Sequence, residues 1–156
     1  MKISRRDLIV ASCAAIVTFA VTFFAIAQDQ TPRRLPSSVF DWQKLEAKTT
    51  KVGARREVFD SATATLDRLE CHVTTVNAGE APHDPHRHPD EELIIVKEGT
   101  LEVAINGRSQ KAGPGSLFFY ASNDLHGMRN VGDTPATYFV LRWTSPGKEG
   151  PRPANK

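Results

Sequence analysis

The chain is organised around the stretch His83-Asp84-Pro85-His86-Arg87-His88-Pro89-Asp90-Glu91-Glu92. It contains a His-x-His pair, His86 and His88, followed after three more residues by the carboxylate of Glu92. A third imidazole, His126, lies much further along in its own turn and strand. Three imidazoles and one carboxylate form a ligand set for a divalent transition metal. The sequence therefore predicts a metal site at these four side chains.

Short segments of alternating polarity surround this stretch. From residue 65 the hydrophobic period is two, so Leu69, Cys71 and Val73 share one face of a predicted half-buried strand. Asn106-Gly107 is a strong signal for a two-residue hairpin. Short strands with Gly, Pro and Asn between them, and no amphipathic helix, predict an all-β antiparallel sandwich or barrel. The expected strands cover residues 53–60, 65–76, 91–97, 100–105, 108–111, 116–120, 125–131 and 136–144.

Alternation along these segments also predicts the environment of single residues. Arg142 alternates with the apolar residues of the last strand, so we expect it to point outward. Asp90 is expected to be a solvated charge, and Asn130 to tie down a turn. Cys71 is expected to be a small core residue. The larger residues expected to be chiefly in the core are Phe118, Tyr120, Met128, Phe139 and Trp143.

The N-terminus has the pattern of an export signal. Ser4-Arg5-Arg6-Asp7 precede an uncharged apolar run from Leu8 to Ala27, which ends in the small-x-small site Ala25-Ile26-Ala27. The paired arginines are similar to those of a twin-arginine signal, which carries a folded protein across a membrane. We therefore expect an apolar signal helix and a periplasmic or otherwise exported protein. A retained membrane anchor is the alternative, because about twenty apolar residues can span a bilayer.

Length and composition limit the remaining possibilities. A chain of 156 residues allows one folded domain. We divide it into a signal peptide at 1–27, a linker at 28–37, a β-barrel at 38–146 and a disordered tail at 147–156. Signal cleavage would leave equal numbers of acidic and basic residues, and no basic stripe is present, so nucleic acid is not an expected partner. Cys71 would then be the one remaining cysteine, which excludes an intrachain disulfide.

The order of the predicted ligands resembles the first of two motifs of the cupin superfamily. His86-x-His88-x3-Glu92-x6-Gly99 matches that motif position by position. The chain departs from it at the start, where six residues rather than five separate Gly79 from His86. A loop insertion of one residue is tolerated at little entropic cost.

The second motif is matched less completely. Gly115, His126 and Asn130 stand at its expected positions. Ala121 replaces the usual proline, and Asn123 replaces the usual glycine. Asparagine is the next best residue at a turn position with positive φ, so we expect the turn to form.

The resemblance covers residues 66–144 and is closest to small single-domain microbial members of the superfamily. It implies a jelly-roll barrel in which His86, His88, Glu92 and His126 converge on one divalent ion. Iron, manganese, nickel, copper and zinc all suit these ligands, so the metal's identity stays open. The resemblance also implies that an N-terminal edge within residues 38–60 can form a homodimer.

Four further residues are candidates for contact with a substrate or with the ligands. His72 either faces the barrel cavity or is an exposed strand residue, and the sequence does not decide between them. Three roles remain open for His83. It is a fifth metal ligand, a hydrogen-bond donor to one of the ligands or, most simply, a solvated loop residue. The full set is His72, His83, Tyr120 and Met128.

The expected function is that of a metal-dependent oxidoreductase, similar to a dioxygenase, acting on a small organic molecule. Two alternatives remain: a non-catalytic periplasmic module that binds a metal or small ligand, and a cupin isomerase or lyase. The sequence identifies no general base apart from the ligands themselves. Membrane contact is expected only through the N-terminal segment.

Overall fold

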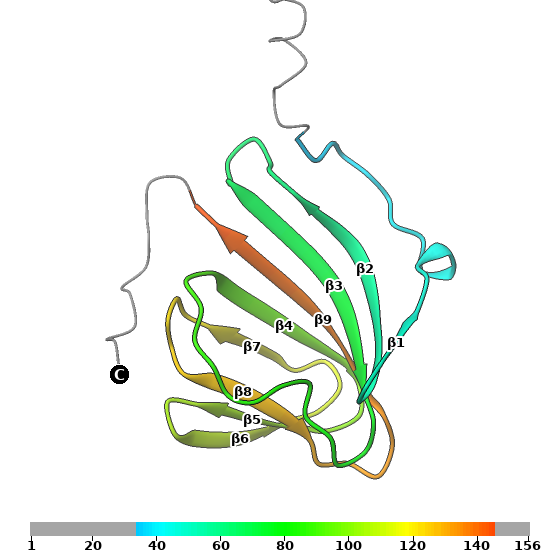
Figure 1. The fold of residues 1–156 in the computed structure, drawn as a ribbon, viewed down its shortest axis with the longest axis vertical. Coiled ribbons are helices and arrows are strands. Elements are labelled where there is room, and N and C mark those ends of the chain that lie inside the picture. The colour runs from blue at the N-terminus through cyan, green and yellow to red at the C-terminus, as the bar shows by residue number, and fades with distance from the viewer. Residues whose placement is uncertain (1–33, 146–156) are drawn as a thin grey trace, which may run out of the picture. The chain divides into compact units, whose positions relative to one another are not determined.

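The computed structural model describes residues 34–145, which form two antiparallel β-sheets with almost no helix (Figure 1). The larger sheet has the strand order β1-β2-β3-β9-β4-β7, and the smaller has the order β6-β5-β8. The predicted signal and tail lie outside the described residues. No helix within residues 34–145 is long and apolar enough to cross a membrane. The elements are η1 Trp42–Lys44, β1 Lys48–Thr50, β2 Gly53–Ser61, β3 Arg68–Val76, β4 Glu91–Glu98, β5 Leu101–Ile105, β6 Arg108–Ala112, β7 Leu117–Tyr120, β8 His126–Asn130 and β9 Ala136–Thr144.

Strand β9 lies between β3 and β4, and its register aligns inward-facing side chains in rows. One row runs from Glu70 through Arg142 and Glu92 to Tyr120. Successive residues of a strand point to opposite faces, so the next inward row begins two residues further along each strand. That row contains His72, Val140, Ile94 and Phe118.

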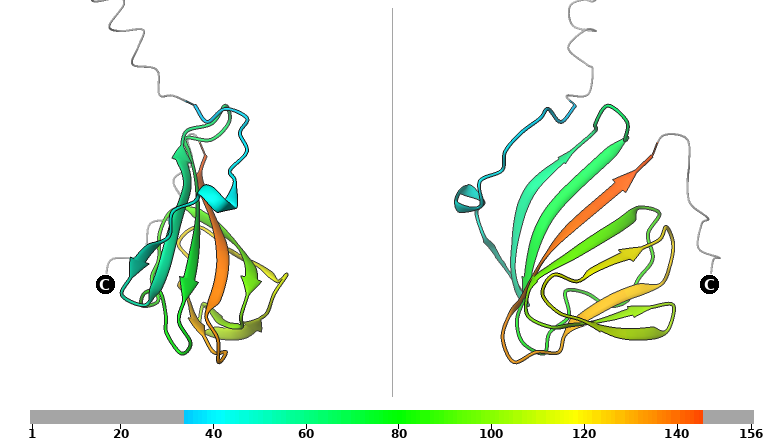
Figure 2. Two further views of the ribbon diagram at one scale, coloured as in Figure 1. Left: turned by 90° about the vertical axis from the view of Figure 1, so that its right-hand side faces the viewer. Right: turned by 180° about the vertical axis from the view of Figure 1, so that it is seen from behind.

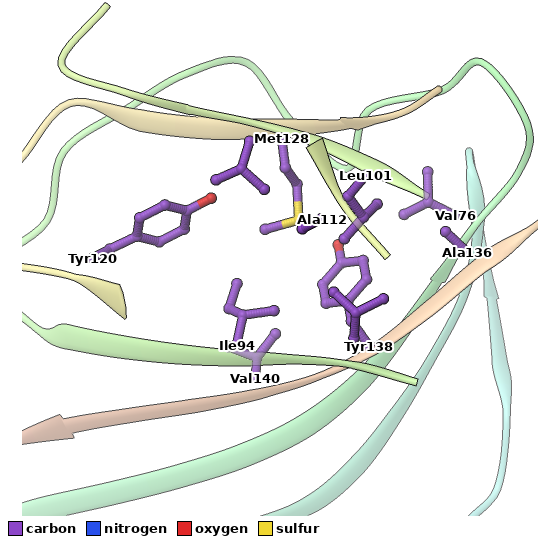
Figure 3. Packing of buried hydrophobic residues seen from close by; sticks show 11 residues of the cluster. Val76, Ile94, Leu101, Ala112, Tyr120, Met128, Ala136, Tyr138 and Val140 are labelled. Atoms are coloured by element: carbon purple, nitrogen blue, oxygen red, sulfur yellow. The ribbon is translucent and has the colours of Figure 1, made fainter. Parts of the chain in front are cut away.

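The hydrophobic core fills the space between the sheets (Figure 3). Tyr120 and Tyr138 are its largest fully buried side chains, and Figure 3 shows Met128 reaching toward them from β8. Phe118 packs against the cluster as a partly buried residue, so three of the aromatic and Met residues expected in the core lie in or on it. The cluster consists of Val76, Ile94, Val96, Leu101, Val103, Ala112, Tyr120, Met128, Ala136, Tyr138 and Val140.

Phe139 and Trp143 lie on the outer face of the large sheet, so the prediction that they belong to this core was wrong. The segment before β1 covers part of that face, and Figure 2 (left) shows η1 in front of β9. The rings of Trp42 and Phe139 are 6.2 Å apart, and those of Phe40 and Phe59 are 5.1 Å apart. Because of this cover, Val73 is fully buried on the outer face, and β3 is buried on both faces rather than one.

Arg142 points inward, which contradicts the sequence prediction. Its guanidinium lies 3.2 Å from Glu70 and 3.3 Å from Asp90, and 27% of the side chain is exposed. Asp90 is also not a solvated charge, because its side chain is only 14% exposed and also lies 3.9 Å from Arg68. The reason is that the outer face of the large sheet is covered, so β9 has apolar residues on both faces. The alternation alone therefore led us to assign the outer row of β9 to the core.

The turn predictions hold. Asn106 and Gly107 have φ of 48° and 81° and connect β5 to β6, as a type I′ hairpin requires. Asn123 has φ of 62°, so asparagine does replace glycine at a left-handed position. Asn130 is fully buried and donates to the carbonyls of Val76 and Thr134, which ties β8 to the following turn.

Candidate metal centre

Backbone pairing brings the His-x-His loop to the start of β8. The amide of His86 donates to the carbonyl of His126 at 2.9 Å, and the amide of His126 donates back at 3.0 Å. Gly127 permits this close approach, because a Cβ there would lie 3.1 Å from the ring of Pro85. The loop between β3 and β4 is therefore held against the small sheet by an isolated β-bridge between His86 and His126, which are distant in sequence.

Three of the four predicted ligands converge. The candidate ligand atoms of His86, His88 and His126 all lie within 4.8 Å of one another, and their ring centroids are 4.7 to 5.2 Å apart. Two ligands at about 2.1 Å from one ion are at most about 4.2 Å apart, so closure around a metal needs movements of less than about 1 Å. This three-histidine cluster can hold a metal ion.

The hydrogen bonds of the rings fit that role. Nδ1 of His88 lies 3.0 Å from the carbonyl of Asp90, and Nδ1 of His126 lies 2.8 Å from that of Asp124. Donation from Nδ1 to a carbonyl leaves Nε2 with its lone pair free for a metal. Nε2 of His126 and Nδ1 of His86 are enclosed and have no hydrogen-bond partner in the described part of the chain. A buried polar atom without a partner is costly, and coordination would satisfy both nitrogens.

Glu92 stands beside the cluster rather than within it. Its Oε2 lies 3.1 Å from Nε2 of His88, and the residue is 7% exposed. The hydrogen bond to Glu92 raises the pKa of His88, and burial only partly opposes it. A metal would displace the proton shared by these two atoms. The structure thus places the fourth predicted ligand next to the three histidines, and its coordination remains a proposal.

Burial favours the neutral, metal-binding form of the other two rings. Burial lowers the pKa of His86, and the neighbouring imidazoles of His83, His126 and His88 lower it further. Burial is also the main cause that lowers the pKa of His126. A neutral imidazole is the form that coordinates a metal.

Two of the other candidates lie around this cluster. Tyr120 is fully buried and stacks on His126 with centroids 4.0 Å apart, while its hydroxyl donates to the carbonyl of Gly127 at 3.3 Å. Burial raises the pKa of Tyr120, so the phenol stays protonated. His83 is exposed and meets His86 edge-on at 4.3 Å. Tyr120 therefore packs on one ring of the three-histidine cluster, and His83 lies at its solvent side.

A cavity of about 390 Å³ opens beside the histidines, between the two sheets. Its volume suits a small organic molecule. Its apolar lining includes Met128, Tyr138 and Val140. Its polar lining includes Arg55, His72, His83, His86, Glu92 and Arg142. A larger hollow of about 760 Å³ lies between β6 and β7, but its lining contains no histidine, cysteine or carboxylate.

His72 faces the cavity, which decides the question that the sequence left open. The residue is 6% exposed, and its Nδ1 lies 2.5 Å from Oε1 of Glu70. Glu70 in turn accepts a hydrogen bond from Arg55 at 2.9 Å and lies 3.2 Å from Arg142. Sequence reasoning missed Glu70, Arg55 and Arg142 as site residues. The sequence did offer one signal: the two-residue alternation along β3 places Glu70 and His72 on the same face of the strand.

The buried carboxylate of Glu70 should make the fold sensitive to acid. Burial opposes its ionisation, but the hydrogen bond from His72 and the charges of Arg142 and Arg55 together hold its pKa below the usual range. A lowered folded pKa contributes stability above the unfolded value, about 4.3, and this contribution is lost as pH falls through the folded pKa. We expect Glu70→Gln to lower the free energy of unfolding by about 1 to 3 kcal/mol at pH 7. The deficit should shrink below about pH 4.

Urea unfolding at pH 7 and pH 3 measures this difference. Glu57→Gln is the matched control, since Glu57 also pairs with Arg55 but its side chain is 55% exposed. Exposed pairs contribute roughly 0 to 1 kcal/mol, so the control should change little at either pH. An equal deficit for Glu70→Gln at both pH values would show that its charge is not the cause.

The described fold is thus an all-β domain with a candidate metal centre, and residues 72–142 match a family model described as a Cupin domain. No curated protein matches the sequence. An RmlC-like cupin from Shewanella frigidimarina NCIMB 400 is 18% identical, with a TM-score of 0.57 over 71% of this chain and 95% of that one. The polyketide cyclase RemF from Streptomyces resistomycificus is 19% identical, with a TM-score of 0.57 over 78% and 89%. A predicted oxalate decarboxylase from Thermotoga maritima is 14% identical, with a TM-score of 0.57 over 69% and 99%.

At these identities the structural likeness shows the fold alone. The match to the Cupin domain model covers residues 72–142, and the solved structures share the fold of this chain.

Proposed function

We propose that this protein is a mononuclear metal-dependent enzyme that acts on a small organic molecule. The proposed ligands are His86, His88 and His126, with Glu92 as the fourth. The observation that carries the proposal is the pair of enclosed ring nitrogens without partners, on His86 and His126, in a cluster whose member His86 lines a cavity of about 390 Å³. A bound divalent ion would supply Lewis acidity and coordination positions for substrate oxygens.

The residues around the cavity support binding of a molecule that is part polar and part apolar. Met128 from the small sheet and Val140 from the large sheet line it and offer apolar surface to a substrate's carbon skeleton. Arg142 and His72 line it with nitrogen donors or acceptors. Such a lining orients a small oxygen-bearing molecule with its oxygens toward the histidines.

Oxidoreductase chemistry of the dioxygenase type is the first reaction that we propose. Four protein ligands on a six-coordinate ion leave two positions, which is enough for a bidentate substrate or for substrate and oxygen. The test is oxygen uptake by Fe(II)-loaded protein with a panel of dihydroxy-aromatics and 1,3-diketones. We expect uptake well above that of the equally treated His88→Ala variant. Metal binding without uptake on any member would favour the non-catalytic binding module instead.

Isomerase or lyase chemistry is the second candidate, and one observation favours it. His72 stands on the cavity wall with a carboxylate behind it. This histidine is a candidate general base separate from the metal ligands. Proton transfer needs such a group, whereas binding alone does not.

We also propose that the protein is exported through its paired arginines. Expression of the full chain with a C-terminal tag in a bacterium that has the twin-arginine pathway tests this. Replacing Arg5 and Arg6 by lysines should retain the protein in the cytoplasm, because that pathway reads the arginine pair. Unchanged recovery from the periplasm would contradict the twin-arginine assignment. The mass of the exported protein distinguishes a cleaved signal from a retained anchor.

A further inference from the structure

We infer that His72, oriented by Glu70, is a proton-accepting catalytic residue of this cavity, and that its substrate is a small α-hydroxycarbonyl compound. The inference rests on the proposed function, because the substrate's two adjacent oxygens must be held at the histidine cluster. It goes beyond that proposal by naming the substrate class and by assigning to Glu70 the orientation of His72.

The hydrogen bond to Glu70 determines how the imidazole is presented. Glu70 has a side chain only 4% exposed, and two guanidinium groups, from Arg55 and Arg142, hold it as a carboxylate. A carboxylate only accepts hydrogen bonds, so the 2.5 Å contact requires that Nδ1 of His72 donate. The lone pair then resides on Nε2. The ring lines the same cavity as His86 and Glu92.

The strand register sets the distance between this imidazole and the proposed ligands. His72 on β3 is opposite Val140, which is opposite Ile94, two residues beyond Glu92. With strands about 4.8 Å apart and about 3.4 Å per residue, the Cα atoms of His72 and Glu92 are about 12 Å apart. Both side chains point into the space between the sheets, and both line the same cavity of about 390 Å³, whose volume suits a small molecule.

Arg142 supplies a second reason for an oxygen-rich substrate. Its Nε is enclosed and makes no well-aligned hydrogen bond, although Oε2 of Glu70 is 3.2 Å away. Its guanidinium lines the cavity on the strand between β3 and β4. A substrate oxygen placed there would receive a charge-assisted hydrogen bond.

The proposed step is a proton transfer that consumes no oxidant or reductant. The C–H bond of the hydroxyl-bearing carbon breaks, and an N–H bond forms at Nε2 of His72. The released electron pair forms the carbon–carbon double bond of an enediolate, and the carbonyl electrons move to its oxygen. Return of the proton to the neighbouring carbon, with transfer of the hydroxyl proton to the former carbonyl oxygen, gives the isomeric hydroxycarbonyl compound. A residue in this role accelerates such a step by about 10² to 10⁴.

Exchange of substrate protons with solvent tests the inference. Zinc-loaded protein is incubated with dihydroxyacetone in D₂O, and loss of the carbon-bound protons is followed by ¹H NMR. We expect His72→Gln to slow this exchange by about 100-fold or more. Glu70→Gln should slow it by about tenfold, because an amide oxygen still accepts a weaker hydrogen bond. Glu57→Gln, which removes the other carboxylate on Arg55, should exchange at the wild-type rate.

Two readouts apart from turnover separate the possible failures. Calorimetric zinc titration should give affinities within about twofold of wild type for the His72 and Glu70 variants. The ¹⁵N shifts of His72 should show Nδ1 protonated in the wild type, and this preference should weaken in Glu70→Gln. Wild-type protein that binds no zinc would refute the proposed function and this inference together. Wild-type protein that binds zinc but exchanges no protons, or His72→Gln that exchanges at the full rate, would overturn the inference alone.

Discussion

Replacing His88 by alanine should abolish tight metal binding and the thermal stabilisation that metal gives. His88 connects the two parts of the proposed site, since it belongs to the three-histidine cluster and its Nε2 lies 3.1 Å from Oε2 of Glu92. Its loss removes one coordinate bond and also the group that holds the Glu92 carboxylate in place. Metal at one hundred times its dissociation constant stabilises a folded protein by about 2.7 kcal/mol. For a domain of this size that corresponds to a rise in Tm of roughly 10 °C.

Elemental analysis and melting curves with and without metal provide the measurement. The wild type should retain one equivalent of metal and melt higher with it, whereas His88→Ala should show neither property. His83→Ala is the matched control, because His83 contacts the ring of His86 but is exposed and lies outside the three-histidine cluster. Full metal content in His88→Ala would show that His88 is not a ligand. Equal losses in both variants would point to the loop rather than to coordination.

The placement of His126 beside His86 illustrates what the sequence could and could not predict. Local spacing identified the His-x-His pair and Glu92, because all three lie within one loop and strand. Hydrophobic periodicity contains no information about a bridge between residues forty positions apart. The prediction that His126 lies beside His86 therefore depended on the resemblance to known cupin motifs. The same resemblance predicted the jelly-roll order of strands. Turn positions such as Asn123 and Gly107 were predictable locally, because positive φ restricts the residue type.

The other wall of the cavity was not predictable in the same way. Alternation shows which residues share a face, but it does not show which face is inner when both are apolar. On β9 the outer row is covered by Trp42, whose contact with Phe139 is tertiary. Arg142 was therefore placed outward, and the ionic cluster around Glu70 went unrecognised. An arginine between apolar neighbours is thus weak evidence for solvent exposure when a terminal segment can cover the opposite face.

Replacing Gly99 by alanine should destabilise the domain strongly, although the change adds a single methyl group. Gly99 lies between β4 and β5, where the chain passes from the large sheet to the small one, and its φ is +83°. A Cβ at this position would lie 2.5 Å from Cα and 2.6 Å from Cβ of Ala136, which is fully buried. The left-handed backbone costs a side chain about 1 to 2 kcal/mol. Overpacking against buried backbone adds about 1 to 3 kcal/mol, and together these lower Tm by about 10 °C or more.

Gly115 separates these two causes, because it has the same φ of +83° but no atom within 4 Å of the position of a Cβ. Gly115→Ala should therefore show only the conformational cost, about 1 to 2 kcal/mol. Urea unfolding of both variants gives the difference, which measures the contact with Ala136. A similar loss in the two variants would mean that backbone conformation alone selects glycine at position 99. A larger loss in Gly99→Ala would show that the chain after β4 and the first residue of β9 must approach closely here.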